Sequence, residues 1–75
     1  MDHTKLTQSL EDYLEMVHML RLANGLARVK DIAAALGVKM PSVAKAMVEL
    51  KKMGLVRQEP YSGVELTEEG ERVAA

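Results

Sequence analysis

Residues 29–50 read VKDIAAALGVKMPSVAKAMVEL, and the spacing of their apolar side chains decides the fold. Apolar residues recur at the i, i+3, i+4, i+7 positions of one helix face in two runs, 29–36 and 43–50. Gly37 ends the first run, and Pro41 suits the first turn of the second, where a missing N–H costs least. The pattern predicts a helix of about two turns ending at Leu36, a short turn, and a longer helix over Met40–Met53 that Gly54 ends.

These two helices have the proportions of a helix-turn-helix, in which the second helix enters the major groove of DNA. Ala33 is small where the helices must cross, Gly37 permits the positive φ of the turn, and Val43 returns to the same contact. Because ordinary helical hairpins rarely combine all three residue types, the stretch favours a DNA-binding unit.

The flanking residues extend this unit. Upstream, helical spacing predicts a helix over Ser9–Ala23, capped by Ser9 and stopped by Asn24-Gly25. Downstream, residues 55–56 and 64–66 are short strand-like runs around a turn containing Pro and Gly, which predicts a β-hairpin. Thr67, followed by two glutamates, predicts the N-cap of a last helix. The expected fold is mainly α with a small β-hairpin, a winged helix-turn-helix forming one domain over residues 1–75.

Composition narrows the class of protein. A chain of 75 residues without Cys, Trp or Phe has room for one core and offers no disulfide, thiolate zinc site or cysteine nucleophile. The sequence has no signal-peptide pattern and no apolar run near the ~20 residues that span a bilayer, so we expect a cytoplasmic protein without a membrane partner. With two His and no Gly-rich phosphate loop, we do not expect an enzyme.

Charge is distributed unevenly along the chain. Residues 26–57 hold seven basic and two acidic side chains, whereas residues 1–25 hold two basic and four acidic ones, and residues 58–75 one basic and five acidic. A basic centre between acidic ends is typical of a face that binds a polyanion, although solvated helix faces also carry Lys.

On the 40–53 helix, the polar face lies opposite the apolar one and defines the expected contacts with double-stranded DNA. Residues near the start of such a helix reach base edges, so Pro41, Ser42 and Lys45 are the candidate base readers, with Met40 beside them. The candidate phosphate contacts are the surrounding cations Arg28, Lys39, Lys51, Lys52 and Arg57. Glu49 on the same face would repel phosphate. The alternatives are a solvated polar face and a winged-helix module that contacts another protein instead of DNA.

Four ordered motifs also resemble one family. SLEDYLE (9–15), ARVKDIA (27–33), PSVAK (41–45) and GLV with LTEEG (54–56 and 66–70) are similar to the N-terminal DNA-binding domain of the diphtheria toxin repressor and manganese transport regulator family. The resemblance implies a transcriptional regulator: a metal-activated homodimer that represses metal-uptake genes by docking its third helix and wing on palindromic operators. It also aligns Pro41, Ser42 and Lys45 with the family's DNA-facing segment, while Ala44 replaces a frequent Ser or Thr.

The resemblance further aligns Asp12 and Glu15 with two carboxylates that ligate metal in the manganese-sensing branch. Carboxylate oxygens suit Mn²⁺ or Fe²⁺, and a cation would offset the repulsion between neighbouring acids such as Glu11 and Glu15. Against this, Asp12 is a natural capping residue, Glu15 an ordinary surface acid, and His18, at Glu-x-x-His spacing, more often a surface residue than a ligand. Family members continue into a dimerisation region with further ligands, so we expect either an excised domain or a short relative that dimerises differently.

Overall fold

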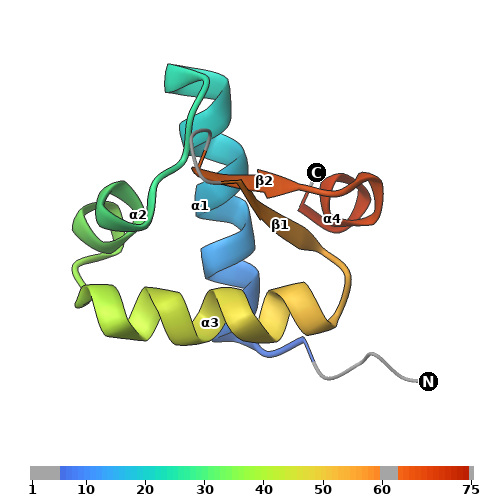
Figure 1. Ribbon diagram of the computed structural model, residues 1–75, viewed down its shortest axis with the longest axis horizontal. Helices are drawn as coiled ribbons and strands as arrows, with labels where there is room; N and C mark the ends of the chain where they lie inside the picture. The colour runs from blue at the N-terminus through green and yellow to red at the C-terminus, as the bar shows by residue number, and fades with distance from the viewer. Residues whose placement is uncertain (1–5, 60–62, 75) are drawn as a thin grey trace.

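The computed structural model describes residues 6–59 and 63–74 (Figure 1). Four helices and one two-stranded antiparallel sheet follow in the order α1 (Gln8–Asn24), α2 (Val29–Leu36), α3 (Met40–Lys52), β1 (Val56–Glu59), β2 (Gly63–Leu66) and α4 (Glu68–Ala74). This is the element order expected of a winged helix-turn-helix. Among the described residues, no helix is both long and apolar enough to cross a membrane.

The start of α1 differs from the prediction. Thr7, not Ser9, is the N-cap, because the Thr7 hydroxyl oxygen accepts a hydrogen bond from the Leu10 N–H at 3.2 Å. Ser9 lies inside the helix and is exposed. The helix ends where expected, at Gly25, whose N–H donates to the Arg21 carbonyl at 2.8 Å. A hydroxyl at position 7 offers the same capping chemistry two residues earlier, which lengthens the helix.

The core is entirely apolar in the part of the chain that the structure describes. Every buried side chain there is aliphatic or Met, and none is polar or charged. The largest fully buried ones are Leu14, Val17, Ile32, Val43, Met47, Leu50 and Val64, drawn from the first three helices and the hairpin. Each contributes roughly 1.5–3 kcal/mol of hydrophobic stabilisation. The core therefore holds α1 against the α2–α3 pair and against the hairpin.

The helix-turn-helix crossing has the predicted residues at its centre. Ala33 and Val43 are both buried, and Gly37 adopts a φ of 69°. The N–H of Val38 donates to the Ala33 carbonyl at 3.0 Å and closes the turn. Helix α3 starts at the predicted Met40 and ends at Lys52, with Met53 as its C-cap. The turn thus sets the direction in which α3 leaves α2.

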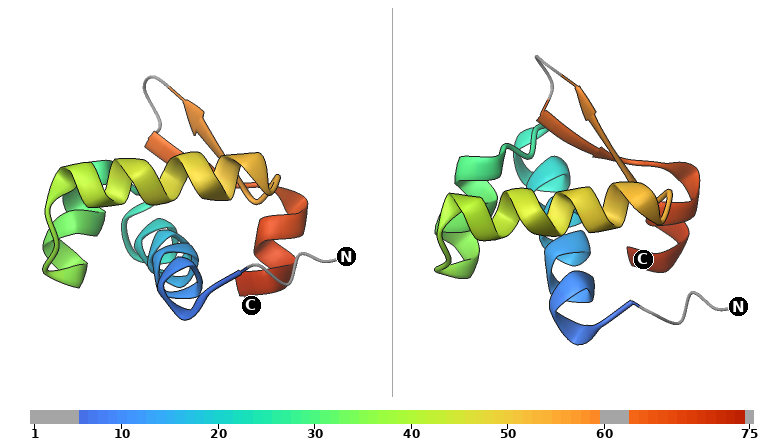
Figure 2. Two further views of the ribbon diagram at one scale, coloured as in Figure 1. Left: turned by 90° about the horizontal axis from the view of Figure 1, so that it is seen from below. Right: turned by 60° about the horizontal axis from the view of Figure 1, so that its bottom comes forward.

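The hairpin is longer than its predicted strands, and its pairing runs from Val56 opposite Leu66 to Glu59 opposite Gly63. Gln58, Glu59 and Gly63, which local propensity assigned to the turn, are held in β1 and β2 by this ladder. Leu55, predicted to begin the first strand, lies before β1. The rest of the predicted turn, residues 60–62, lies outside the described residues. In both views of Figure 2 the hairpin stands beside α3 and projects past it on one side of the molecule.

Two close approaches fix the ends of the hairpin. At one end, the Val64 N–H donates to the Ala27 carbonyl at 2.8 Å, and a Cβ on Gly63 would lie only 2.5 Å from that carbonyl oxygen. At the other end, a Cβ on Gly70 of α4 would lie 2.0 Å from the Leu55 carbonyl oxygen. The hairpin is therefore anchored to the α1–α2 connection and to α4.

Thr67 caps α4 as predicted, and its hydroxyl group makes a second hydrogen bond to the turn after α3. Its hydroxyl oxygen accepts from the Gly70 N–H at 3.0 Å, and the same hydroxyl donates to the Gly54 carbonyl at 2.7 Å. One side chain therefore joins the start of α4 to the turn that follows α3.

Candidate nucleic-acid interface

The outward side of α3 is the candidate DNA-reading surface. Val43, Ala46, Met47 and Leu50 face the core, and this places the predicted readers Pro41, Ser42 and Lys45 on the solvent side, where all three are exposed. Met40, at the start of the helix, is 50% exposed. The structure thus presents the predicted base readers together on one accessible helix.

The start of α3 carries further positive potential. Lys39 is the N-cap, and its side chain makes no capping hydrogen bond. Its carbonyl accepts the N–H groups of Ser42 and Val43 at 3.0 and 3.3 Å. The positive end of the helix dipole and the exposed Lys39 ammonium group together favour an anion at this end of α3.

The remaining lysines of α3 are also exposed. Lys39, Lys45 and Lys51 form no ion pair with any residue in 6–59 or 63–74, whereas the Lys52 ammonium lies 3.9 Å from the Glu49 carboxylate. Such an exposed pair contributes only about 0–1 kcal/mol, so a phosphate can replace Glu49 as the partner of Lys52. The repulsion expected from Glu49 is therefore partly neutralised by its neighbour.

Arg28 lies near the hairpin. It is exposed at the start of α2, directly after Ala27, the residue that bridges to Gly63 of β2. The sequence gives no local signal for this neighbourhood, since residues 28 and 63 are far apart along the chain. The fold therefore brings a predicted phosphate contact close to the start of β2.

Arg57, the predicted phosphate contact of the wing, already has a partner. Its guanidinium donates to the Glu65 carboxylate across the hairpin at 3.1 Å. The other oxygen of Glu65 lies 3.9 Å from the Arg21 guanidinium of α1. A phosphate at Arg57 must compete with a carboxylate that is shared by two arginines.

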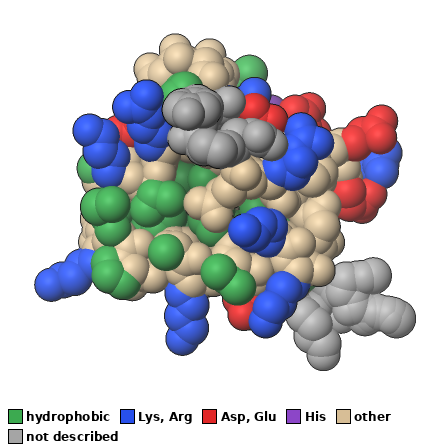
Figure 3. All heavy atoms as spheres, viewed as in Figure 1, with side chains coloured by type: hydrophobic (Ala, Val, Ile, Leu, Met, Phe, Trp, Pro, Cys, Tyr) green, Lys and Arg blue, Asp and Glu red, His purple; other side chains and the backbone are tan. Residues whose placement is uncertain are grey.

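A set of apolar side chains on α3 was not singled out from the sequence as a unit. Met40, Ala44 and Val48 lie one turn apart and are exposed, with Val48 at 46%. We call these three residues the methyl stripe. Figure 3 shows hydrophobic side chains over α2 and α3 on this face, with Lys and Arg side chains around them. The helical period of α3 places Val48 outside the core. An apolar residue at an outward position is the signal by which the stripe could have been found from the sequence.

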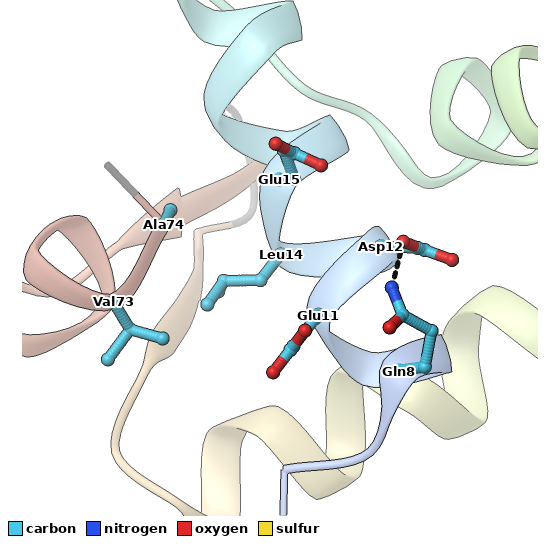
Figure 4. A pocket seen from close by; sticks show the side chains of 7 residues that line it. All are labelled: Gln8, Glu11, Asp12, Leu14, Glu15, Val73 and Ala74. Carbon is cyan, nitrogen blue, oxygen red and sulfur yellow. Dashed lines mark hydrogen bonds between the residues drawn. The ribbon is translucent and has the colours of Figure 1, made fainter.

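The predicted metal ligands lie elsewhere, on α1. Glu11, Asp12 and Glu15 line a surface cavity of about 290 Å³ together with Val73 and Ala74 of α4. Figure 4 shows that the three carboxylates point in different directions, and that of Asp12 accepts a hydrogen bond from the Gln8 amide at 3.1 Å. Across the described ranges, no three His, Cys, Asp or Glu side chains are grouped closely enough to hold a metal ion.

His18 is not part of this cavity. It lines a separate hollow with Arg21, Leu66 and Glu71, on the α1 segment nearer Gly25. The structure therefore brings Asp12 and Glu15 to one cavity and leaves His18 apart from them.

Residues 5–64 match the family model described as iron dependent repressor, N-terminal DNA binding domain. The transcriptional regulator MntR of Escherichia coli O157:H7 is 46% identical over 87% of this chain and 42% of its own length. The HTH-type transcriptional regulator MntR of Bacillus subtilis is 43% identical over 89% of this chain and 47% of its own.

A solved structure agrees with these sequence matches. The crystal structure of IdeR from T. acidophilum superposes with a TM-score of 0.80 at 32% identity, covering 91% of this chain and 31% of that one. The winged helix-turn-helix fold is thereby confirmed. The chain spans less than half the length of the MntR proteins that it matches.

Proposed function

The chain belongs to the iron-dependent repressor family through its N-terminal DNA-binding domain, and on this premise we propose that it binds double-stranded DNA sequence-specifically and regulates transcription. The observation that carries the proposal is the outward side of α3, where exposed Pro41, Ser42 and Lys45 stand opposite a fully apolar inner side. In this arrangement α3 enters the major groove and its first turns contact base edges.

The cations around α3 contact the phosphates in this proposal. Lys39 and Lys52 flank the base readers on α3 itself, and Lys51 lies beside Lys52. Arg28 lies close to the start of β2, and Arg57 lies on β1. Phosphate contacts fix the position of a protein on the duplex but carry no base information. The wing therefore adds affinity, while α3 supplies sequence preference.

A divalent cation would regulate this binding. The relatives are named as iron-dependent repressors and MntR, and Asp12 and Glu15 offer oxygen donors that suit Mn²⁺ or Fe²⁺. Two carboxylates leave most of an octahedral shell unfilled, so we propose that they form part of a site completed by further ligands. When bound, the cation would bring residues of α1 together with those ligands.

The longer relatives suggest the oligomeric state and the regulatory role of the whole protein. We propose a cytoplasmic homodimeric repressor of metal-uptake genes that places one winged domain on each half of a palindromic operator, without enzymatic activity. A dimer doubles the phosphate contacts and raises affinity through effective concentration.

Fluorescence anisotropy with a labelled duplex at 50 and 200 mM salt, with and without Mn²⁺, tests the function. If the five cations Arg28, Lys39, Lys51, Lys52 and Arg57 all contact phosphates, the logarithm of the binding constant should fall with a slope of about −4.5 against the logarithm of salt concentration. Absence of binding to every duplex at 50 mM salt would overturn the proposal.

A further inference from the structure

The methyl stripe is an exposed apolar surface on α3, and phosphate binding gives no reason for it. Met40, Ala44 and Val48 occupy positions i, i+4 and i+8, so they lie on one line along the helix surface. The line is about 12 Å long at the rise of an α-helix. Two of its three side chains, Met40 and Val48, are among the few large hydrophobic groups exposed in the part of the chain that the structure describes.

The charges around the stripe indicate what covers it. Lys45 and Lys52 lie on the same outward side of α3, and Lys39 and Lys51 lie next to the two ends of the stripe. An apolar protein surface placed on the stripe would desolvate several of these ammonium groups without pairing them, at a high energetic cost. A polyanion that carries methyl groups between its charges would do both: its charges would pair with the lysines, and its methyl groups would cover the apolar side chains.

The major groove of an A·T-containing duplex has this chemistry. Of the natural bases, only thymine presents a methyl group there, at C5, and apolar side chains such as Ala contact it. The phosphates that border the groove supply the negative charge.

We propose that Met40, Ala44 and Val48 bind thymine C5-methyl groups, so that the methyl stripe, and Val48 in particular, determines a preference for thymine. This inference rests on the proposed DNA-binding function and deepens it. The 12 Å line matches the rise of about three to four base pairs at 3.4 Å each. The preferred thymines therefore fall within a run of three to four base pairs in each bound half-site.

Replacing thymine by deoxyuridine tests the proposal, because it removes only the methyl group. A duplex is selected from a random 20-base-pair library on the 75-residue chain at 50 mM salt, and each T is then replaced by U in turn. Burial of one methyl group is expected to change affinity about threefold to fivefold. We expect that loss at two or three adjacent positions for the unchanged chain.

Protein variants identify the side chain that contacts the removed thymine methyl group. In Val48→Ala the affinity for the thymine duplex should fall by a similar factor, and the T-to-U change at one position should have no further effect. Met19→Ala on α1 is the matched control: Met19 is 53% exposed, similar to Val48, and this variant should keep both affinity and sensitivity to the methyl group. Circular dichroism confirms that each variant is folded.

The outcomes separate this inference from the function beneath it. Selection of sites without thymine, or equal affinity for the T and U duplexes, overturns the role of the methyl stripe while leaving DNA binding intact. Loss of methyl sensitivity in Met19→Ala as well as Val48→Ala also overturns it. Failure to bind any duplex at 50 mM salt rejects the proposed function itself.

Discussion

Arg57 and Glu65 face each other across the hairpin, and a 3.1 Å hydrogen bond joins the guanidinium to the carboxylate. The same carboxylate lies 3.9 Å from Arg21 of α1. Arg57, the wing residue proposed to contact phosphate, is therefore paired with an acid of the same hairpin.

Substitutions at Arg57 and Glu65 should change the affinity for DNA in opposite directions. Arg57→Ala should reduce the salt slope of DNA binding by about one unit and leave sequence preference unchanged, because a phosphate contact releases counterions and reads no base. Glu65→Gln should strengthen binding to all duplexes alike, since it removes the acid that competes with phosphate. If Glu65→Gln still strengthens binding in the Arg57→Ala background, the competition at Arg57 is not the cause.

Two lysines of α3 should behave differently. Lys45→Ala should weaken binding to the selected duplex by about 1–3 kcal/mol more than binding to unrelated sequences, if Lys45 contacts a base edge. Lys52→Ala should lower affinity on all duplexes equally, as expected for a phosphate contact. Anisotropy titrations on both kinds of duplex measure the difference. Unchanged affinity in both variants would exclude this side of α3 from the interface.

Gly63 should be far less tolerant of a side chain than Gly54, although both have a positive φ. Gly54→Ala meets nothing within 4 Å and should cost about 1–2 kcal/mol of unfolding free energy from backbone conformation alone. Gly63→Ala adds the contact with the Ala27 carbonyl and should cost roughly 2–4 kcal/mol. Urea denaturation of both variants checks this, and equal losses would mean that the wing shifts without cost.

Thr67 should matter through its hydroxyl group. Thr67→Val removes the bond to the Gly54 carbonyl and the cap of α4, and it should lower the free energy of unfolding by about 1–2 kcal/mol. Thr67→Ser keeps both bonds and should recover most of that loss. Thermal unfolding followed by circular dichroism gives the comparison; a serine variant as unstable as the valine variant would show that the hydroxyl group alone does not account for the stabilisation.

Calorimetry with Mn²⁺ examines the carboxylates of α1. The 75-residue chain should bind the ion weakly, because Asp12 and Glu15 leave most of the coordination to water, and DNA binding by this chain should be nearly independent of metal. Asp12→Asn and Glu15→Gln should remove the residual binding. A tight, stoichiometric isotherm that disappears in either variant would show instead that the chain completes its own site.

Local patterns were sufficient for the helices and the turn between α2 and α3, because the positions of Ala33, Gly37 and Val43 are set by helical period and turn geometry. The N-cap at Thr7 was missed because Thr7 and Ser9 have the same capping chemistry two residues apart. The strand lengths were underestimated because Gln58 and Glu59 are held by cross-strand pairing, which local propensity does not contain.

The candidate site could likewise be predicted from the sequence only where helical periodicity determines it. Exposure of Pro41, Ser42 and Lys45 follows from the period of α3. The pairing of Arg57 with Glu65 depends on the register of the hairpin, and the position of Arg28 beside the wing depends on the contact between Ala27 and Gly63. Such contacts join distant parts of the chain, so no short stretch of sequence encodes them.

The bond from the Val64 amide to the Ala27 carbonyl has a consequence for the order of folding. Its two residues are separated by about half of the chain, and closing so large a loop costs entropy that local helix formation does not. We therefore expect the wing to acquire its anchor only after α1, α2 and α3 have assembled. Mutations at this bond should therefore accelerate unfolding more than they slow folding, which makes the wing the last part of the domain to form and the first to detach.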